Sequence, residues 1–398
     1  MWRDLRPSEP QGRLVRRANR LLVNLAGNDY LGLANHPRLQ EAAIEAVRRF
    51  GVGAGASRLT AGDLPLHQQL EQRFASFKHS EAALLCPTGY MANLAVLTTL
   101  AGPGDLICVD KLNHASLIDG ARFSGATVRV YPHGNLAKLE RLLDRHRHAE
   151  GGRRFDDPDH PEAGDVSDRA PRRFIVTDTV FSMDGDTADL PALCDIADEQ
   201  GAILVVDEAH ATGVLGPNGS GLAEMMAVSD RIDITVSTAS KALGGLGGLI
   251  TADRCVIDTI INRGRCFIYT TAPPPAQVAA INTALDVLGK EPWRRTRLLD
   301  LAGTLRERLD KLGLFPDHGH ERRVVTPIVP VIAGSATAAV SLSEHLERRG
   351  LLVPAIRPPT VAPGSCRVRI SLRADLEEGD LDRLLDALGA WPRDVVTP

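Results

Sequence analysis

Two short stretches place reactive side chains at the ends of expected strands. Asp207 closes an apolar, β-branched run, and His210 follows it three positions later. Lys241 stands between residues 237–240, rich in serine and threonine, and a cluster of glycines. Glycines let backbone approach a ligand closely, and a lysine amine becomes nucleophilic when it is desolvated or lies beside cations. An acidic residue and a histidine alone are equally typical of a helix cap and a surface side chain, so the pairing with Lys241 carries the argument.

An aspartate at one strand end and a lysine at another are what pyridoxal phosphate (PLP) requires. PLP stores electrons only while its pyridine nitrogen is protonated, which a buried carboxylate such as Asp207 ensures, and it binds covalently to a lysine such as Lys241. Its phosphate needs backbone N–H groups at the start of a helix. Residues 87–93 have the pattern of a strand-to-helix turn that supplies such groups, although an ordinary turn has the same pattern.

The elements that position these residues alternate between strands and helices. Short apolar, β-branched runs predict strands, and the segments between them have helical periodicity. This alternation predicts an α/β fold with a mostly parallel sheet flanked by helices, and a ligand site beyond the carboxyl ends of the strands. The predicted strands cover residues 82–86, 106–109, 127–131, 174–179, 202–207, 232–237 and 248–251.

The chain of 398 residues is long enough for two domains. After about residue 279 helical periodicity dominates, which predicts a smaller α+β C-terminal domain. We expect an N-terminal arm over residues 1–33, a large domain over 34–289 and a small domain over 290–398. The polar segment 146–172 predicts a solvated surface loop, and we expect no metal there because its His and Asp residues lack a regular ligand spacing.

Composition excludes several classes of protein. The net charge is −4 with both signs interspersed, which argues against nucleic acid as a partner. The apolar stretches are far shorter than a membrane span, and the first residues lack the apolar core of a secretory signal. The six cysteines show no CxxC pairing, so we expect reduced thiols and a cytoplasmic location.

Taken in order, the motifs of this chain resemble those of the α-oxoamine synthase family. The family consists of fold-type I PLP-dependent transferases, and the resemblance covers nearly the whole chain. It implies PLP as the cofactor, an acyltransferase activity, and a homodimer with shared active sites. The matching segments are residues 28–33, 51–59 with His67 and Glu71, 113–120, 180–186, 207–213, 240–241 and 269–275.

Residues 356–364 and 367–370 are similar to one branch of this family. That branch joins L-alanine to a pimeloyl thioester in biotin biosynthesis by a decarboxylative Claisen condensation. The resemblance leaves open whether coenzyme A or an acyl carrier protein carries the pimeloyl group. Two other branches stay open, one joining glycine to acetyl-CoA and one joining serine to a long-chain acyl thioester.

Two alternatives from other classes are weaker. A non-catalytic partner subunit would have lost the reactive residues, yet Lys241, Asp207, His210 and His114 are all present. An unrelated nucleotide-binding protein would carry its glycines after the first strand, whereas here they follow the lysine.

The resemblance implies a role for individual residues at the cofactor. Lys241 is expected to bind PLP and to move the Cα proton, Asp207 to pair with the pyridine nitrogen, and His114 to stack on the ring and touch the substrate. These three are the implied catalytic residues. The other implied contacts are Gly89, Tyr90 and Thr238 to the phosphate, Ser182 and His210 to the phenolic oxygen, and Thr271 to the phosphate of a neighbouring subunit.

The resemblance also implies substrate contacts. Arg369 is expected to hold the amino-acid carboxylate, which a guanidinium fork matches with two hydrogen bonds. Asn28 is expected near the bound amino acid, and Thr360 on the path of the acyl group. Arg3 ranks ahead of Arg6 as the N-terminal arginine that contacts the acyl substrate.

Overall fold

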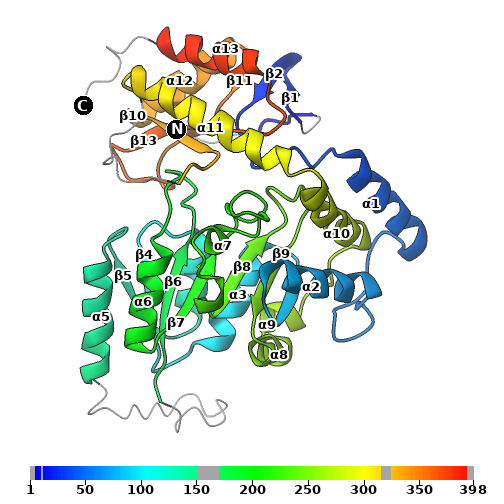
Figure 1. Cartoon of the computed structure of the whole chain (residues 1–398), viewed down its shortest axis with the longest axis vertical. Helices are drawn as coiled ribbons and strands as arrows, with labels where there is room; N and C mark the ends of the chain where they lie inside the picture. Colours follow the sequence, from blue (N-terminus) through cyan, green and yellow to red (C-terminus); the bar gives the residue numbers. More distant parts are fainter. Residues whose placement is uncertain (1–4, 10–11, 150–169, 315–323, 392–398) are drawn as a thin grey trace.

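The computed structural model describes residues 5–9, 12–149, 170–314 and 324–391 (Figure 1). Arg3 lies outside the described residues, as does most of the segment 146–172. The expected contact of Arg3 with the acyl substrate therefore stays a prediction.

A seven-stranded sheet forms the centre of the larger part, with strand order β3-β9-β8-β7-β6-β4-β5. All neighbours in it are parallel except at β9, which runs antiparallel to both β3 and β8. Each predicted strand is confirmed, with ends shifted by at most two residues. The strands are β3 (Ala82–Cys86), β4 (Leu106–Asp110), β5 (Thr127–Tyr131), β6 (Arg173–Asp178), β7 (Ile203–Asp207), β8 (Ile234–Thr238) and β9 (Gly248–Ala252).

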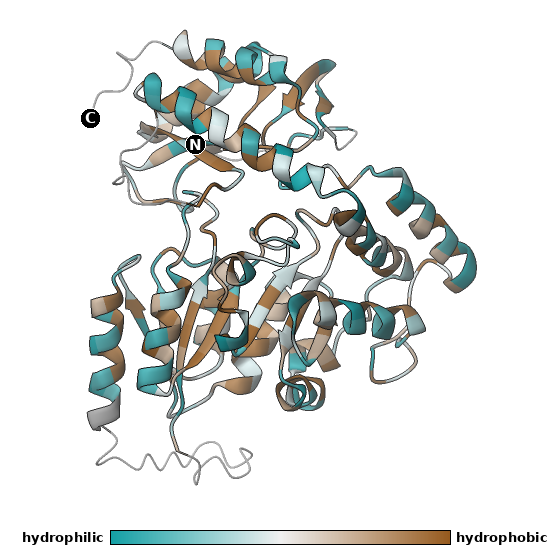
Figure 2. Cartoon of the chain, viewed as in Figure 1, coloured by the Kyte–Doolittle hydropathy of each residue, from teal (hydrophilic) through white to brown (hydrophobic). Residues whose placement is uncertain are grey.

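The sheet is buried on both faces, which explains its continuous apolar runs. Successive residues of a strand point to opposite faces, so Val205 packs into one core cluster and Val206 into the other. Helices cover both faces, and Figure 2 shows the brown strands enclosed by helices with teal outer sides. They are α2 (Pro65–Lys78), α3 (Gly89–Leu100), α4 (Ala115–Phe123), α5 (Leu136–Ala149), α6 (Leu190–Gln200), α7 (Leu222–Met225), α8 (Arg254–Arg263), α9 (Arg265–Ile268) and α10 (Pro275–Lys290), with a 3-10 turn at Ser229–Arg231.

The C-terminal part contains an antiparallel sheet of order β10-β13-β12. Its strands are β10 (Ile328–Gly334), β12 (Ala355–Ile356) and β13 (Cys366–Ser371), and α11 (Trp293–Lys311), α12 (Ala336–Arg348) and α13 (Glu378–Gly389) surround it. This arrangement agrees with the expected α+β character, while the domain boundaries themselves stay a prediction.

The N-terminal segment is more than an extended arm. Its strands β1 (Leu14–Arg17) and β2 (Arg20–Asn24) form a hairpin, and β2 pairs in parallel with β11 (Leu351–Leu352). Figure 1 shows this hairpin beside the C-terminal part. After β2 the chain continues to α1 (Pro37–Phe50), which packs on α10. No helix in the described ranges is long and apolar enough to span a membrane.

Candidate active site

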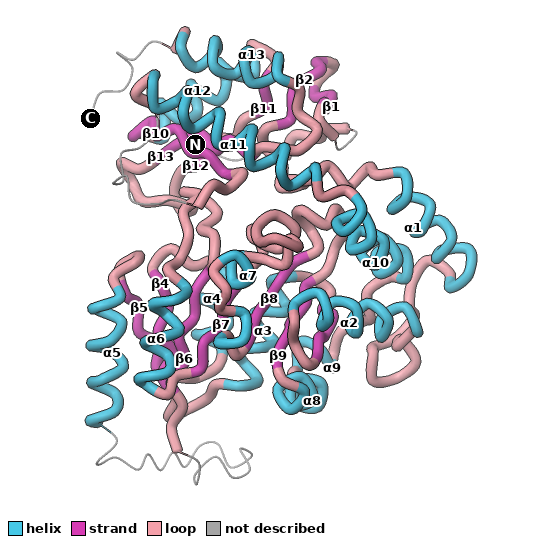
Figure 3. The backbone as a smooth tube through the Cα atoms, viewed as in Figure 1, coloured by secondary structure: helices cyan, strands magenta, loops and turns pink. Residues whose placement is uncertain are grey.

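The carboxyl ends of neighbouring strands bring the predicted residues to one edge of the sheet. Asp207 ends β7 and is the register partner of Asp178 on β6 and of Val236 on β8. Thr238 ends β8, and Lys241 follows it on the next turn. Figure 3 shows loops gathered between this edge and the C-terminal part. Parallel topology therefore brings these residues to the sheet edge at which the sequence predicted a ligand site.

Lys241 and His210 meet at this edge. The Lys241 Nζ lies 2.8 Å from His210 Nε2, and His210 Nδ1 lies 2.7 Å from the Tyr30 hydroxyl. Desolvation lowers the pKa of Lys241 to about 8, although Asp207 and Asp178 oppose this shift. Complete burial and the Lys241 ammonium hold the pKa of His210 well below its usual range. The site thus pairs a neutral imidazole with an amine that can lose its proton near neutral pH.

Tyr30 and Arg369 extend this contact toward the N-terminal segment. Arg369 Nη2 donates to the Tyr30 hydroxyl at 3.2 Å and to Asn28 Oδ1 at 3.1 Å. Burial raises the pKa of Tyr30 to about 12 while Arg369 opposes it, so the phenol stays protonated. Arg369 is buried, and its Nε has no hydrogen-bond partner among the described residues. A buried guanidinium with an unused N–H is suited to binding a carboxylate.

Asp207 is held as a hydrogen-bond acceptor on both oxygens. Its Oδ1 accepts from Ala209 N at 2.8 Å, and its Oδ2 accepts from Asn93 Nδ2 at 2.7 Å. His114 caps the start of α4, and its backbone N–H donates to Asp178 Oδ2 at 2.6 Å. Burial, and then the neighbouring Asp207, raise the pKa of Asp178 well above its usual range. His114 itself is exposed, which leaves its ring open toward a ligand.

The expected phosphate contacts lie at the start of α3. Thr88 caps this helix by accepting from Met91 N at 3.1 Å. The other N–H groups of a helix's first turn have no partner within the helix. Gly89 lies against Thr238, and a Cβ at Gly89 would stand 3.3 Å from Thr238 Cβ. The Tyr90 hydroxyl donates to Asp119 Oδ2 at 2.7 Å. A helix N-terminus beside a hydroxyl suits an anion.

The remaining predicted residues lie on loops. Ser182 follows β6 in a loop that Arg367 of β13 contacts at Met183 O, 3.3 Å away. Thr360 is exposed and donates its backbone N–H to Arg357 O. Thr271 is exposed and pairs with Ser57 through an isolated β-bridge. Within the described part of the chain, the side chains of Ser182, Thr271 and Thr360 make no hydrogen bond to the cluster around Lys241, so their roles stay predictions.

Three residues of the site were missed from the sequence alone. Tyr30 and Ser116 lie inside segments 28–33 and 113–120, which resemble the family, and Asn93 lies in the strand-to-helix turn predicted at residues 87–93. Their order along the chain carries no signal for which side chains meet. Only the contact of distant segments identifies them.

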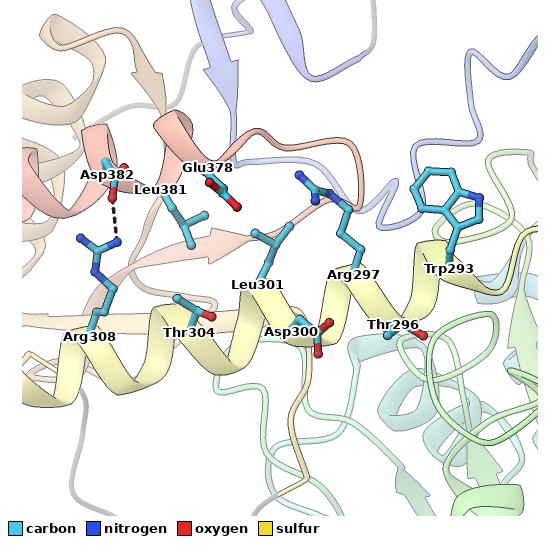
Figure 4. A pocket seen from close by; sticks show the side chains of 10 residues that line it. All are labelled: Trp293, Thr296, Arg297, Asp300, Leu301, Thr304, Arg308, Glu378, Leu381 and Asp382. Atoms are coloured by element: carbon cyan, nitrogen blue, oxygen red, sulfur yellow. Dashed lines mark hydrogen bonds and ion pairs between the residues drawn. The ribbon is translucent and has the colours of Figure 1, made fainter.

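A separate cavity of about 680 Å³ lies between α11 and α13 (Figure 4). Arg308 pairs there with Asp382 at 2.7 Å, and Arg297 donates to the Ala374 and Leu376 carbonyls. Arg308 thus connects α11 to α13, and Arg297 connects α11 to the loop that precedes α13. None of the residues assigned to the chemistry lines this cavity, so we do not treat it as the active site.

Comparison with known proteins agrees with this geometry. The family model "Aminotransferase class I and II" matches residues 20–388. The 8-amino-7-oxononanoate synthase of Anaeromyxobacter sp. (strain K) is 44% identical over 389 residues, which is 98% of this chain and 91% of that protein.

Solved structures share the fold. A serine palmitoyltransferase from S. paucimobilis with a bound PLP-myriocin aldimine superposes with a TM-score of 0.87 at 29% identity, covering 97% of this chain and 92% of that one. The 8-amino-7-oxononanoate synthase of Francisella tularensis has a TM-score of 0.75 at 28% identity, covering 92% of this chain and 97% of that one. The expected fold-type I architecture is therefore confirmed. On its sequence and on its fold, this chain belongs to the class I and II aminotransferase family and, within it, to the 8-amino-7-oxononanoate synthases of the α-oxoamine synthase group.

Proposed function

We propose that this protein is a PLP-dependent acyltransferase that joins L-alanine to a pimeloyl thioester. The products are 8-amino-7-oxononanoate, CO2 and the free thiol of the carrier, as biotin biosynthesis requires. The observation that carries the proposal is the placement of Lys241 Nζ 2.8 Å from His210, at the strand edge that also carries Asp207. A lysine with a lowered pKa beside a buried carboxylate suits PLP chemistry.

The residues at this edge fit PLP in charge and in donor type. Asp207 would accept from a protonated pyridine nitrogen, His210 and Ser182 would contact the phenolic oxygen, and Gly89 with Thr238 would hold the phosphate. When bound there, PLP withdraws electrons from the Cα of the amino acid. Thr271, with its neighbour Thr270, would reach the phosphate in a second subunit.

The chain's own residues then handle the substrate and its proton. Lys241 Nζ removes the Cα proton of alanine, because its pKa of about 8 leaves an unprotonated fraction at neutral pH. Arg369 holds the alanine carboxylate, and Asn28 and Tyr30 orient its guanidinium. The carboxylate that Arg369 holds while the proton is removed must later leave as CO2, so its contact with Arg369 would loosen between the two steps.

We propose a homodimer in which each subunit completes the other's site. Large apolar side chains are exposed on both sides of the Ser57–Thr271 bridge, with Leu59 51% and Tyr269 73% exposed. Exposed apolar groups next to a predicted site support an interface with a second copy of the chain. Tyr269→Ser should shift the protein toward monomers in sedimentation velocity and weaken PLP retention. An unchanged dimer in this variant would place the interface elsewhere.

We also propose a cytoplasmic location. All six cysteines are free thiols, and four of them, Cys86, Cys108, Cys194 and Cys366, are buried. Unpaired buried thiols are typical of proteins in a reducing compartment.

A second candidate differs only in its substrates. Serine palmitoyltransferase structures superpose with a TM-score of 0.87, against 0.75 for the solved 8-amino-7-oxononanoate synthase, which favours serine and a long-chain acyl thioester. Identity of 44% to 8-amino-7-oxononanoate synthases, against 29% to the serine enzyme, supports alanine and pimeloyl instead. We rank the alanine reaction first because the identity is higher over almost the whole chain.

A competition assay tests the proposal. The purified protein receives pimeloyl-CoA with equal concentrations of alanine, glycine and serine, and the amino ketone is identified by its mass. We expect 8-amino-7-oxononanoate, lost in Lys241→Ala and kept in Lys138→Ala, a matched change on the outer helix α5. A glycine or serine product alone would contradict the assignment to alanine. If pimeloyl-CoA gives no product, the same assay with a pimeloyl acyl carrier protein decides between the two carriers.

A further inference from the structure

A buried amide links Asp207, expected at the pyridine nitrogen of the cofactor, with His114, expected to stack on the cofactor ring. Asn93 of α3 is 1% exposed, and its Nδ2 donates to Asp207 Oδ2 at 2.7 Å and to Ser116 Oγ at 2.8 Å. Ser116 is completely buried in α4, and its Oγ lies 2.7 Å from His114 Nδ1. Four side chains therefore form a continuous row from Asp207 to His114.

The directions of the first two hydrogen bonds in this row follow from Asp207. A carboxylate only accepts, so the Asn93 amide must turn its Nδ2, and not its Oδ1, toward Asp207. This Nδ2 has two hydrogens, and the second one points at Ser116 Oγ. The Ser116 hydroxyl has one hydrogen, which is then free for His114 Nδ1. Within the described residues Asn93 Oδ1 has no partner, which agrees with an amide orientation set by its donors.

A second donor reaches the same nitrogen. The backbone N–H of Ser116 donates to His114 Nδ1 at 3.3 Å, as a helix N-cap requires. An ordinary N-cap histidine would have this backbone contact alone. Here Ser116 Oγ also lies 2.7 Å from this nitrogen. A nitrogen that accepts the backbone N–H carries no proton, so the Ser116 hydroxyl is the donor in the second contact.

We propose that Asn93 and Ser116 are positioning residues that hold His114 as the neutral tautomer with its proton on Nε2. The Nε2–H is then a hydrogen-bond donor on the exposed side of the ring, where a substrate oxygen can accept it. The same Asn93 Nδ2 also orients the carboxylate of Asp207. One amide therefore positions both Asp207 and, through Ser116, the ring of His114. This functional consequence rests on the proposed reaction, whereas the tautomer is a property of the chain itself.

The surroundings of His114 agree with a neutral ring. Desolvation lowers its pKa, Asp207 raises it, and the Lys241 ammonium lowers it, with a net shift below the usual value. Asp119 is the other acidic group that raises it. The hydrogen bonds that Nδ1 accepts act in the same direction as the net shift, because only the neutral ring can accept them.

The test is 15N NMR of the full-length protein labelled in its histidine rings, first with PLP bound and then with PLP removed. His114→Asn identifies the His114 signals. In the wild-type protein we expect a pyridine-type Nδ1 and a pyrrole-type Nε2 above the pKa of the ring. Ser116→Ala removes one donor to the neutral ring, so its pKa should rise and the ratio of neutral to protonated ring at acid pH should fall about fivefold, the factor for one hydrogen bond. Asn93→Ala should weaken the preference for this tautomer, because the Ser116 hydroxyl can then reverse while the Ser116 backbone N–H still donates to Nδ1.

Ser124→Ala is the matched control. It removes a hydroxyl from the other end of α4, where Ser124 Oγ donates to Ala121 O at 2.7 Å, and should leave the His114 signals unchanged. A pyrrole-type Nδ1 in the wild-type protein overturns the proposal, as does a Ser116→Ala spectrum identical to that of Ser124→Ala. If Asn93→Ala does not fold, Ser116→Ala decides alone. The expected spectra without PLP, together with a failed condensation assay, would refute the proposed reaction and not the tautomer.

Discussion

Lys78 and Glu208 form a buried ion pair behind the active site, and breaking it should destabilise the protein strongly. Lys78 Nζ donates to Glu208 Oε2 at 2.5 Å, to Thr212 Oγ1 at 2.9 Å and to the Ser220 carbonyl. All three ammonium hydrogens are therefore used inside the protein. Glu208 is 1% exposed and stands directly after Asp207.

The size of the effect follows from what Lys78→Met leaves behind. The methionine fills most of the space of the lysine stem, but Glu208 then keeps one hydrogen bond, from Ala223 N at 2.9 Å. The backbone at Gly221 packs closely on the Glu208 carboxylate, since a Cβ added at Gly221 would stand 1.9 Å from Glu208 Oε2. An unpaired buried charge of this kind costs about 3–5 kcal/mol. Lys78→Met with Glu208→Gln removes the charge and should recover much of this loss.

Urea unfolding followed by far-UV circular dichroism measures the change. All variants are compared at one protein concentration, because association of subunits adds to stability. Arg308→Met is the control, because it breaks an exposed pair with Asp382 and should cost less than about 1 kcal/mol. A loss below about 1 kcal/mol in Lys78→Met would refute the reasoning. So would a double variant as unstable as the single one.

Three further changes test other parts of the structure. Arg369→Ala should raise the KM for alanine more than it slows CO2 release from a supplied β-keto acid, and equal losses would contradict a loosened contact. Desolvation lowers the pKa of His133, but hydrogen bonds to Asp110 and Asp186 outweigh it and raise the pKa to about 10. Because this pKa is above the usual 6.5, the contribution of protonated His133 to the free energy of unfolding is fully present below pH 6.5. It is lost as the pH rises through 10. The difference in urea midpoint between wild type and His133→Gln should therefore shrink from pH 7 to pH 10, and a constant difference would argue against the ion pairs. Gly303 lies inside α11 with no atom within 4 Å of an added Cβ. Gly303→Ala should therefore stabilise the protein by about 1 kcal/mol. A lower melting temperature would show that the added methyl group collides with a neighbour.

Much of the large sheet could be predicted from the sequence. Strands buried on both faces need apolar residues at nearly every position, so each produces a run that is visible without knowledge of its neighbours. Parallel strands also end at a common edge, which places Asp207 and Lys241 together once the strands are known. Their chemistry follows from residue type and from position just beyond a strand.

Other parts of the fold have no local signal. The strands β11 and β12 have two residues each, too few to show an alternation. The hairpin at residues 14–24 joins β11 through a parallel pairing that no turn connects. The segment expected as an arm is for this reason part of a sheet.

The sequence by itself determined the sheet, its order of motifs and the reactive residues Asp207, His210 and Lys241. Only the tertiary structure decided which side chains complete the site. Arg369 meets Asn28 from 341 positions away, and Asn93 meets Asp207 from 114 positions away. The physical reason is that side-chain hydrogen bonds depend on distances of a few ångströms between segments, whereas sequence patterns report only burial and backbone geometry along one segment.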